Sequence, residues 1–143
     1  MVGLVATAAM TLLELVFWGR WGLVGVLEWH ENQMIWSRVS GRDADIPSPF
    51  GIFSLHFLNG GLAAIPFPFV ARAHLFGGTP LLVVGLGYAV LLWVLTLVTI
   101  HKAVTGVSIG GNPHGIGPAV VSVLGHLVYG SLLALLASGV GLA

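Results

Sequence analysis

Cysteine is absent from this chain of 143 residues, and charged residues are scarce. Without a thiol, the chain cannot form a disulfide, bind zinc or an iron–sulfur cluster through cysteine, or use thiol catalysis. Asp, Glu, Lys and Arg make up 7% of the residues, against about 25% in an average soluble domain. Five basic residues balance five acidic ones, so there is no basic surface of the kind that binds nucleic acid. We therefore expect no nucleic acid among its partners.

Apolar residues dominate what remains, at 57% of the chain, and the mean hydropathy is +1.00. A helix needs about 20 mostly apolar residues to cross a hydrocarbon core about 30 Å thick. Four segments meet this requirement, at residues 3–27, 48–71, 80–101 and 118–140. The sequence therefore predicts an all-α fold, an integral membrane bundle of four transmembrane helices in a single domain. No soluble domain is expected.

The second predicted span has clear signals at both ends. Ser48 is a suitable helix N-cap, and Pro49 follows it at the first helical position. Pro66 and Pro68 are expected to kink the far end of the span. Thr79 and Pro80 repeat the start signal for the third span, whereas residues 28–47, which hold most of the charge, read as a polar loop.

Four spans place both termini on one side of the membrane and the loops 28–47 and 105–117 on the other. Positively charged residues are enriched in cytoplasmic loops. Four of the five basic residues fall on the side of these two loops: Arg20, Arg38, Arg42 and Lys102. We therefore expect the two loops in the cytoplasm and the termini outside. Only Arg72 falls on the side of the termini.

Two of the six histidines, His56 and His126, lie in the interior of predicted spans, whereas His101 marks the exit of the third. At a rise of 1.5 Å per residue, His56 lies about 10 Å beyond Pro49 and His126 about 12 Å beyond Pro118. Both spans start from the same side, so the two side chains reach similar depths and can face each other. His74 is expected on the opposite side, near the termini.

The surroundings of these two histidines are alike. Residues 56–64 and 126–134 align at a constant offset of seventy positions, matching in His, Gly, Leu and Ala. This similarity suggests a duplicated helical hairpin, whose halves would be related by an axis along the membrane normal. Apolar segments rich in Gly, Ala and Leu also match by chance, so both explanations remain open.

Two interpretations of His56 and His126 follow. In the first, the two imidazoles ligate a b-type haem between the helices, with Asn59 and Tyr129 one turn further on tuning the site. In the second, each histidine hydrogen-bonds a neighbouring helix, and the nearby glycines allow close packing. No other metal site is expected, because the chain has no motif of the His-Glu-x-x-His kind.

Glu14 lies near the middle of the first span, where a charged carboxylate is costly to bury. It is expected to be protonated or paired. In a functional interpretation, Glu14 lies on a proton or ion path. In a structural one, it bonds to Thr11 or to the Trp18 indole, one turn away on the same helix face.

The segments at the two ends of the chain, residues 3–11 and 125–130, resemble small uncharacterised polytopic membrane families of prokaryotes, chiefly archaeal. The resemblance implies a membrane span at each end and a location in a prokaryotic plasma membrane. It implies no activity and no site residue.

The sequence contains no nucleotide motif and no recognisable catalytic set, so no catalytic residue is assigned. We therefore expect a non-catalytic subunit of a larger membrane complex, in a respiratory or other redox context, in contact with lipid and other membrane subunits. One alternative is an electron carrier in which His56 and His126 hold a b-type haem or a metal. Another is a transporter of a small solute or ion, with Glu14 and the two histidines lining its path.

Overall fold

The computed structural model describes residues 1–73 and 77–139. Within these ranges the regular structure is helical throughout and contains no strand, which confirms the all-α prediction. The predicted position of His74 and the last residue of the fourth predicted span, residue 140, lie outside the described residues.

Four helical stretches are long and apolar enough to cross a membrane, as predicted. The first is α1 (Val2–Trp21), and the fourth is α7 (Gly117–Gly139). The second and third are composite. The second joins α3 (Pro49–Ala63) to α4 (Phe67–Arg72), and the third joins α5 (Leu81–Trp93), a π-helical stretch η3 (Val94–His101) and α6 (Lys102–Thr105).

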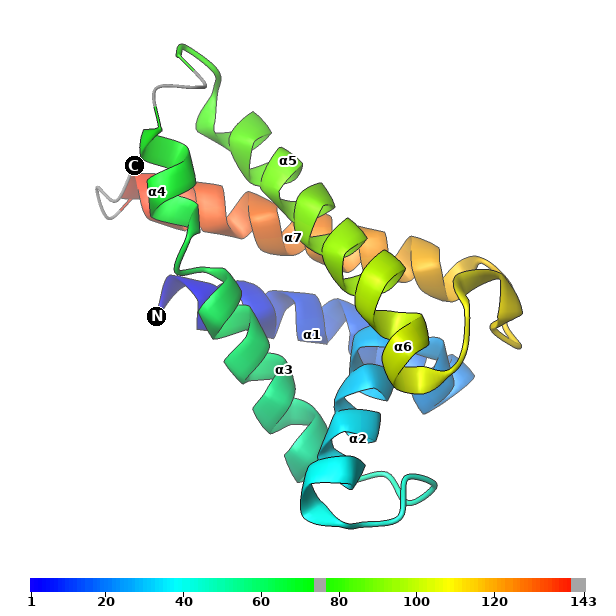
Figure 1. The fold of residues 1–143 in the computed structure, drawn as a ribbon. Helices are drawn as coiled ribbons and strands as arrows, with labels where there is room; N and C mark the ends of the chain where they lie inside the picture. Colours follow the sequence, from blue (N-terminus) through cyan, green and yellow to red (C-terminus); the bar gives the residue numbers. More distant parts are fainter. Residues whose placement is uncertain (74–76, 140–143) are drawn as a thin grey trace.

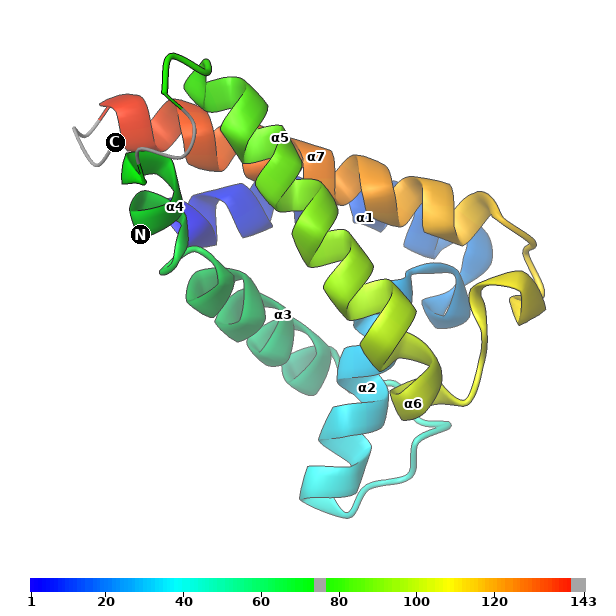
Figure 2. The ribbon, with the colours of Figure 1, turned by 45° about the horizontal axis from the view of Figure 1, so that its top comes forward.

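The spans pack in two pairs that meet along α1 and α7. Helices α1 and α7 run side by side, α5 crosses α7, and α3 packs against α1 (Figures 1 and 2). The N-terminus, α4 and the start of α5 lie at the same end of the bundle as the end of α7 (Figure 1). The bundle therefore has the alternating order of helix directions that four consecutive spans require.

The start of α3 follows its predicted signals. The Ser48 hydroxyl accepts a hydrogen bond from the Gly51 amide at 3.4 Å, and Pro49 is the first helical residue. The predicted kink is confirmed, since α3 ends at Ala63 before Pro66 and α4 begins at Phe67. The third span differs slightly, because α5 begins after Pro80 and no side chain caps it.

The first span is shorter than predicted. It ends at Trp21, six residues before the expected boundary, because Gly22 turns the chain with φ of +67° and its amide donates to the Trp18 carbonyl. A positive φ of this size is readily adopted by glycine alone. A short 3₁₀ turn, η1 (Leu23–Gly25), then redirects the chain.

The prediction of a loop over residues 28–47 is wrong, because most of this segment is helical. Helix α2 (Leu27–Ser40) has 14 residues, too few to cross a bilayer, and packs against α3 at the end of the bundle away from the termini (Figure 1). Its polar residues include buried ones. Gln33, for example, donates to the Ala44 and Ile46 carbonyls and accepts from the Ser48 amide, which ties α2 to the start of α3.

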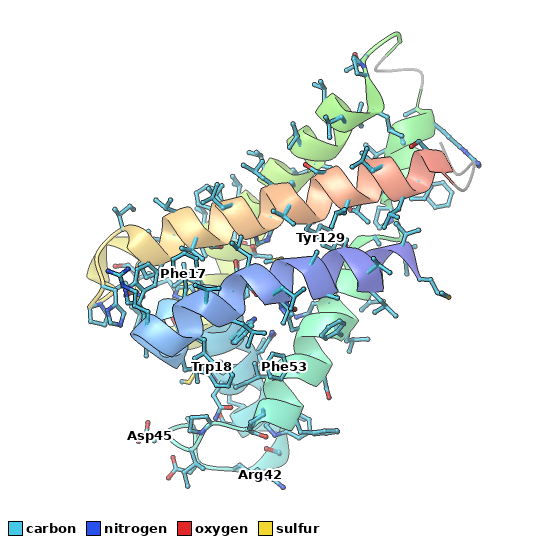
Figure 3. The ribbon with its side chains drawn as sticks, turned by 180° about the vertical axis from the view of Figure 1, so that it is seen from behind. Phe17, Trp18, Arg42, Asp45, Phe53 and Tyr129 are labelled. Atoms are coloured by element: carbon cyan, nitrogen blue, oxygen red, sulfur yellow. The ribbon has the colours of Figure 1, made fainter. Side chains whose placement is uncertain are left out.

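An aromatic cluster joins α1, α2 and α3. The Trp29 ring packs edge-on against Trp18 and Phe53, with ring centroids 5.2 and 5.0 Å apart. Figure 3 shows Trp18 and Phe53 on neighbouring helices, with Arg42 and Asp45 in the loop beyond α2. Trp29 has no exposed surface, so the start of α2 belongs to the core.

Candidate functional site

Three carboxylates and three histidines gather where α2 enters the bundle. Each carboxylate lies beside a histidine from another helix, and the six residues are called the Glu–His cluster below. The closest nitrogen-to-oxygen distances are 3.4 Å for His56 and Glu14, 2.9 Å for His101 and Glu31, and 3.5 Å for His126 and Glu28. All six side chains are at least mostly buried.

Five helical elements contribute to this cluster. Glu28 and Glu31 are three residues apart on α2, a spacing that places both on one helix face. Glu14 comes from α1, His56 from α3 and His126 from α7. His101 is the last residue of the π-helical stretch η3, and such stretches are rare and often found at functional sites.

Glu14 is fully buried, and its partner is not the one predicted. The Trp29 indole of α2 donates to Glu14 Oε2 at 2.8 Å, whereas Thr11 donates to the Thr7 carbonyl. Neither Thr11 nor Trp18 therefore serves as the partner of the carboxylate. The prediction is wrong because residues 27–40 form a helix that packs in the bundle, which brings Trp29 to Glu14.

His56 and His126 do lie together, as their depths predicted. Both line a cavity of about 120 Å³ between the spans and α2. Glu28, Glu31, Asn59 and Tyr129 line it too, as do seven further residues: Thr7, Met10, Asn32, Gly60, Ala63, Leu92 and Thr96. Glu14 lies behind His56 rather than on the cavity surface.

Asn59 and Tyr129, which were predicted to tune a histidine site, bind to other helices instead. The Asn59 amide donates to Asn32 on α2 at 3.2 Å, and the Tyr129 hydroxyl donates to the Gly60 carbonyl on α3. These two bonds hold α2 to α3 and α7 to α3. Both residues therefore fix the helices that form the cavity.

The third pair is anchored on α7. Glu28 accepts a hydrogen bond from the Ser122 hydroxyl, and His126 Nδ1 lies 3.0 Å from the Ser122 carbonyl oxygen. If His126 carries its proton on Nδ1, that nitrogen donates to the carbonyl, and the other ring nitrogen remains for a further partner. One turn of α7 thus presents both a hydroxyl and an imidazole to Glu28.

Burial alters the proton affinities of two neighbouring side chains on α2, Glu31 and His30. Burial raises the pKa of Glu31 above its usual value, an effect that the negative charge of Glu28 reinforces and the hydrogen bond from His101 opposes. Burial also lowers the pKa of the neighbouring His30, whose ring lies 6.0 Å from that of His101. A proton is therefore easily kept on Glu31 and easily lost from His30.

The cavity lining contains no Lys or Arg among the residues that the structure describes. Three charged carboxylates without compensation would be very costly in a buried site. One proton in each Glu–His pair makes the pair neutral overall, whether it lies on the carboxyl or on the imidazole. The cluster therefore needs about three protons, or an equivalent positive charge.

The site does not fit a haem. Pockets for drug-sized ligands have volumes of roughly 300–1,000 Å³, and a porphyrin is at least that large. The cavity of about 120 Å³ is far smaller. In residues 1–73 and 77–139, no group of three or more His, Asp or Glu side chains has the arrangement of a metal site.

Comparison with known proteins gives a family but no activity. The chain belongs to DUF6789. This is a family of unknown function, and its model matches residues 1–140. No curated protein and no solved structure matches the chain. Membership in DUF6789 therefore leaves the function to be argued from the site, and the resemblance to archaeal membrane families stays a prediction.

Sequence reasoning missed half of the cluster in this DUF6789 member. Glu28 and Glu31 were assigned to a solvated loop, and His101 to the exit of a span. One signal was present, since Glu28, Glu31 and Asn32 share a helical face with Leu27 in a segment with no glycine or proline before Gly41. That pattern predicts a helix, but it does not reveal that the polar face is the buried one.

Proposed function

We propose that the protein transports protons through the Glu–His cluster. The observation that carries the proposal is the burial of three carboxylates, each beside a histidine from a different helix. Ionisable residues inside membrane spans are rare and costly, and chains of Asp, Glu and His form the proton relays of pumps and transporters.

The chemistry of the pairs supports proton movement. Imidazole is the side chain whose unperturbed pKa lies nearest neutral pH, and it can accept a proton on one nitrogen while releasing another. In each pair the proton can reside on the carboxyl or on the ring. Because His56 senses the charges of Glu28 and His126, and Glu31 senses those of Glu28, His101 and His126, a proton that moves in one pair alters the next.

The cavity supplies the link between the pairs. His56 and His126 both line it, and its volume of about 120 Å³ is enough for several water molecules. A chain of water would connect the side of Glu14 and His56 to the side of Glu31 and His101. Beyond His101, the half-buried His30 leads toward the solvent-exposed end of α2.

Proton flux into liposomes tests the proposal. Purified protein is reconstituted with a pH-sensitive dye inside, and a potassium diffusion potential drives the protons. We expect the wild type to acidify the lumen at least tenfold faster than Glu14→Gln. Glutamine keeps an acceptor for the Trp29 indole but cannot take up and release a proton.

Asp45→Asn is the matched control, because Asp45 is exposed in the loop beyond α2. This change should leave the flux at the wild-type rate. Wild-type vesicles that acidify no faster than protein-free vesicles, or an unaltered flux in Glu14→Gln, would reject the proposal.

The subunit hypothesis and its respiratory context remain predictions. Large apolar side chains are exposed along all four spans, for example Leu12, Leu58, Leu91 and Leu135. Lipid covers such faces as well as partner helices do. Exposed apolar faces therefore do not distinguish the hypotheses. The buried Glu–His cluster does, because a proton path needs ionisable groups inside the bundle and a purely structural subunit does not, so it favours the transport hypothesis.

A further inference from the structure

The cavity opens to one side of the bundle. Most of its lining residues are buried, including both histidines. Apart from Glu28 on α2, the lining residues that keep exposed surface all come from the second and third spans: Asn59, Gly60, Ala63, Leu92 and Thr96. The mouth of the cavity therefore lies between α3 and the junction of α5 with η3.

The packing of the helices explains this mouth. Helix α3 packs on α1 and α2, whereas α5 packs on α7. Figures 1 and 2 show α3 and α5 as separate ribbons, with α3 beside α1 and α5 crossing α7. Toward the termini, the Tyr88 hydroxyl of α5 bonds to the Ala63 carbonyl of α3 at 2.6 Å and closes the gap. In a bilayer the mouth faces lipid rather than either aqueous side.

The groups inside select the charge of a ligand. Glu28 and Glu31 line the cavity, and no Lys or Arg does within the described chain. His56 is 5% exposed, and its Nε2 atom lies 3.4 Å from Glu14 Oε2, so its ring is held by the carboxylate behind it. An anion would be repelled here, whereas a cation that donates hydrogen bonds would meet the carboxylates of Glu28 and Glu31.

The polar residue at the mouth is out of place against lipid. The Asn59 amide nitrogen donates to Asn32, but the side chain keeps exposed surface on an apolar span, and exposed amide surface is costly against hydrocarbon. The half-buried Thr96 lies across the mouth on the third span. A molecule with a polar head and an apolar tail would satisfy both this rim and the surrounding lipid.

We propose that the cavity binds the ammonium head of a lipophilic amine, which enters from the bilayer between α3 and α5. This inference rests on the proposed function and names the class of cation that exchanges for the proton. A protonated carboxyl of the cluster releases its proton, and the carboxylate formed pairs with the incoming ammonium ion. One positive charge enters and one proton leaves, so the charge of the site is unchanged.

The small volume of the cavity determines which part of the amine lies inside it. A cavity of about 120 Å³ is smaller than the roughly 300–1,000 Å³ that encloses a drug-sized molecule. Only the head and the first carbons fit inside. The rest of the tail lies in the mouth beside Ala63 and Leu92, in contact with lipid.

Proton release on binding tests this inference directly. Protein in lipid nanodiscs is titrated with octylammonium in weakly buffered solution at neutral pH, and a pH dye measures the protons. We expect about one proton released for each ammonium bound. Octanol and octanoate, with a similar tail but a neutral or negative head, should release none, and empty nanodiscs give the background.

Variants at the mouth test the entry route. Thr96→Trp places a large side chain in the opening and should weaken octylammonium binding at least tenfold, and Leu92→Trp serves as a second variant if the first does not fold. Leu95→Trp is the matched control, because Leu95 is exposed on the same helix and does not line the cavity. It should bind as the wild type does.

Three results would overturn the inference: binding without proton release, equal binding of octanoate, or equal affinity in Thr96→Trp and Leu95→Trp. The flux assay for the proposed function contains no amine. An intact, Glu14-dependent proton flux together with any of these results would therefore remove the amine and leave proton transport standing.

Discussion

Each buried carboxylate of this protein has a distinct environment. Glu14 receives an indole N–H, Glu28 a serine hydroxyl, and Glu31 a ring nitrogen of His101. A buried polar group without a partner costs about 1–3 kcal/mol, and a charged one costs more. The partners come from other helices in every case, so the cluster forms only when the bundle does.

Glu31 should make the stability of the protein depend on pH. Because its pKa is raised above the usual 4.5, the folded protein holds this proton more tightly than the unfolded chain does. The stabilisation is fully present below about 4.5 and is lost as pH rises through the raised pKa. We expect the melting temperature of detergent-solubilised protein to fall as pH rises through the raised pKa of Glu31. Glu31→Gln should remove the part of this fall that Glu31 causes.

His30 contributes in the opposite direction. Its lowered pKa gives a stabilisation that is present above the usual 6.5 and is lost as pH falls. Glu31→Gln should leave this acid-side loss in place, and Asp45→Asn should reproduce the wild-type melting curve at every pH. A Glu31→Gln profile that matches the wild type would show that this carboxyl does not titrate with folding.

At the scale of the helices, α5 and α7 form the closest contact. Gly85 and Gly130 face each other where the two helices cross, and a Cβ atom added to either would collide with the carbonyl oxygen of the other. Small residues at such crossings allow backbones in membranes to approach closely. The crossing also fixes His126, one turn before Gly130, relative to the third span.

Gly130→Ala should separate α5 from α7 and destabilise the protein by about 1–3 kcal/mol, as overpacking does in well-packed cores. Thermal unfolding in detergent measures the effect. Gly87→Ala, on the partner helix α5, is the control, because a Cβ atom at Gly87 has open space around it. Equal stability of the two variants would contradict the close contact between α5 and α7 at Gly130.

At the scale of the whole molecule, the connecting segment after α2 and the one after α6 lie at the same end of the bundle. The Arg38 guanidinium donates to the Val104 carbonyl at 2.6 Å, which holds the end of α2 against the end of α6. The short turn η4 (Ile109–Gly111) follows α6. Both connecting segments therefore lie at the end of the bundle away from the termini.

We predict that this end faces the cytoplasm. The chain has no cysteine, so single cysteines at the exposed Ser40 and Gly111 can be labelled without background. A maleimide that cannot cross the membrane should react with both from the cytoplasmic side and with neither from outside. Labelling of the two positions from opposite sides would contradict the four-span arrangement.

The hypothesis of a duplicated hairpin stays a prediction. Helices α3 and α7 both start at the end of the bundle that holds α2, as the repeat requires, and each contributes one histidine to the cavity (Figure 1). Only the first half contains an inserted helix, α2. Any duplication would therefore have been followed by divergence in the connection between its helices.

The sequence by itself determined the four spans and the common depth of His56 and His126. These follow from hydropathy, helix length and the rise per residue, which are local properties of the chain. The signals at Ser48, Pro49 and Pro66 also acted locally, so the start and the break of the second span were predictable.

Only the tertiary structure decided which polar residues are buried together. The charge of residues 28–47 indicated contact with water, but α2 turns Glu28 and Glu31 toward histidines of other spans. Polarity predicts exposure only when no partner lies within the fold. The partners of these carboxylates are distant in the sequence. His101 lies seventy positions after Glu31 and His126 ninety-eight after Glu28, and packing alone brings them together.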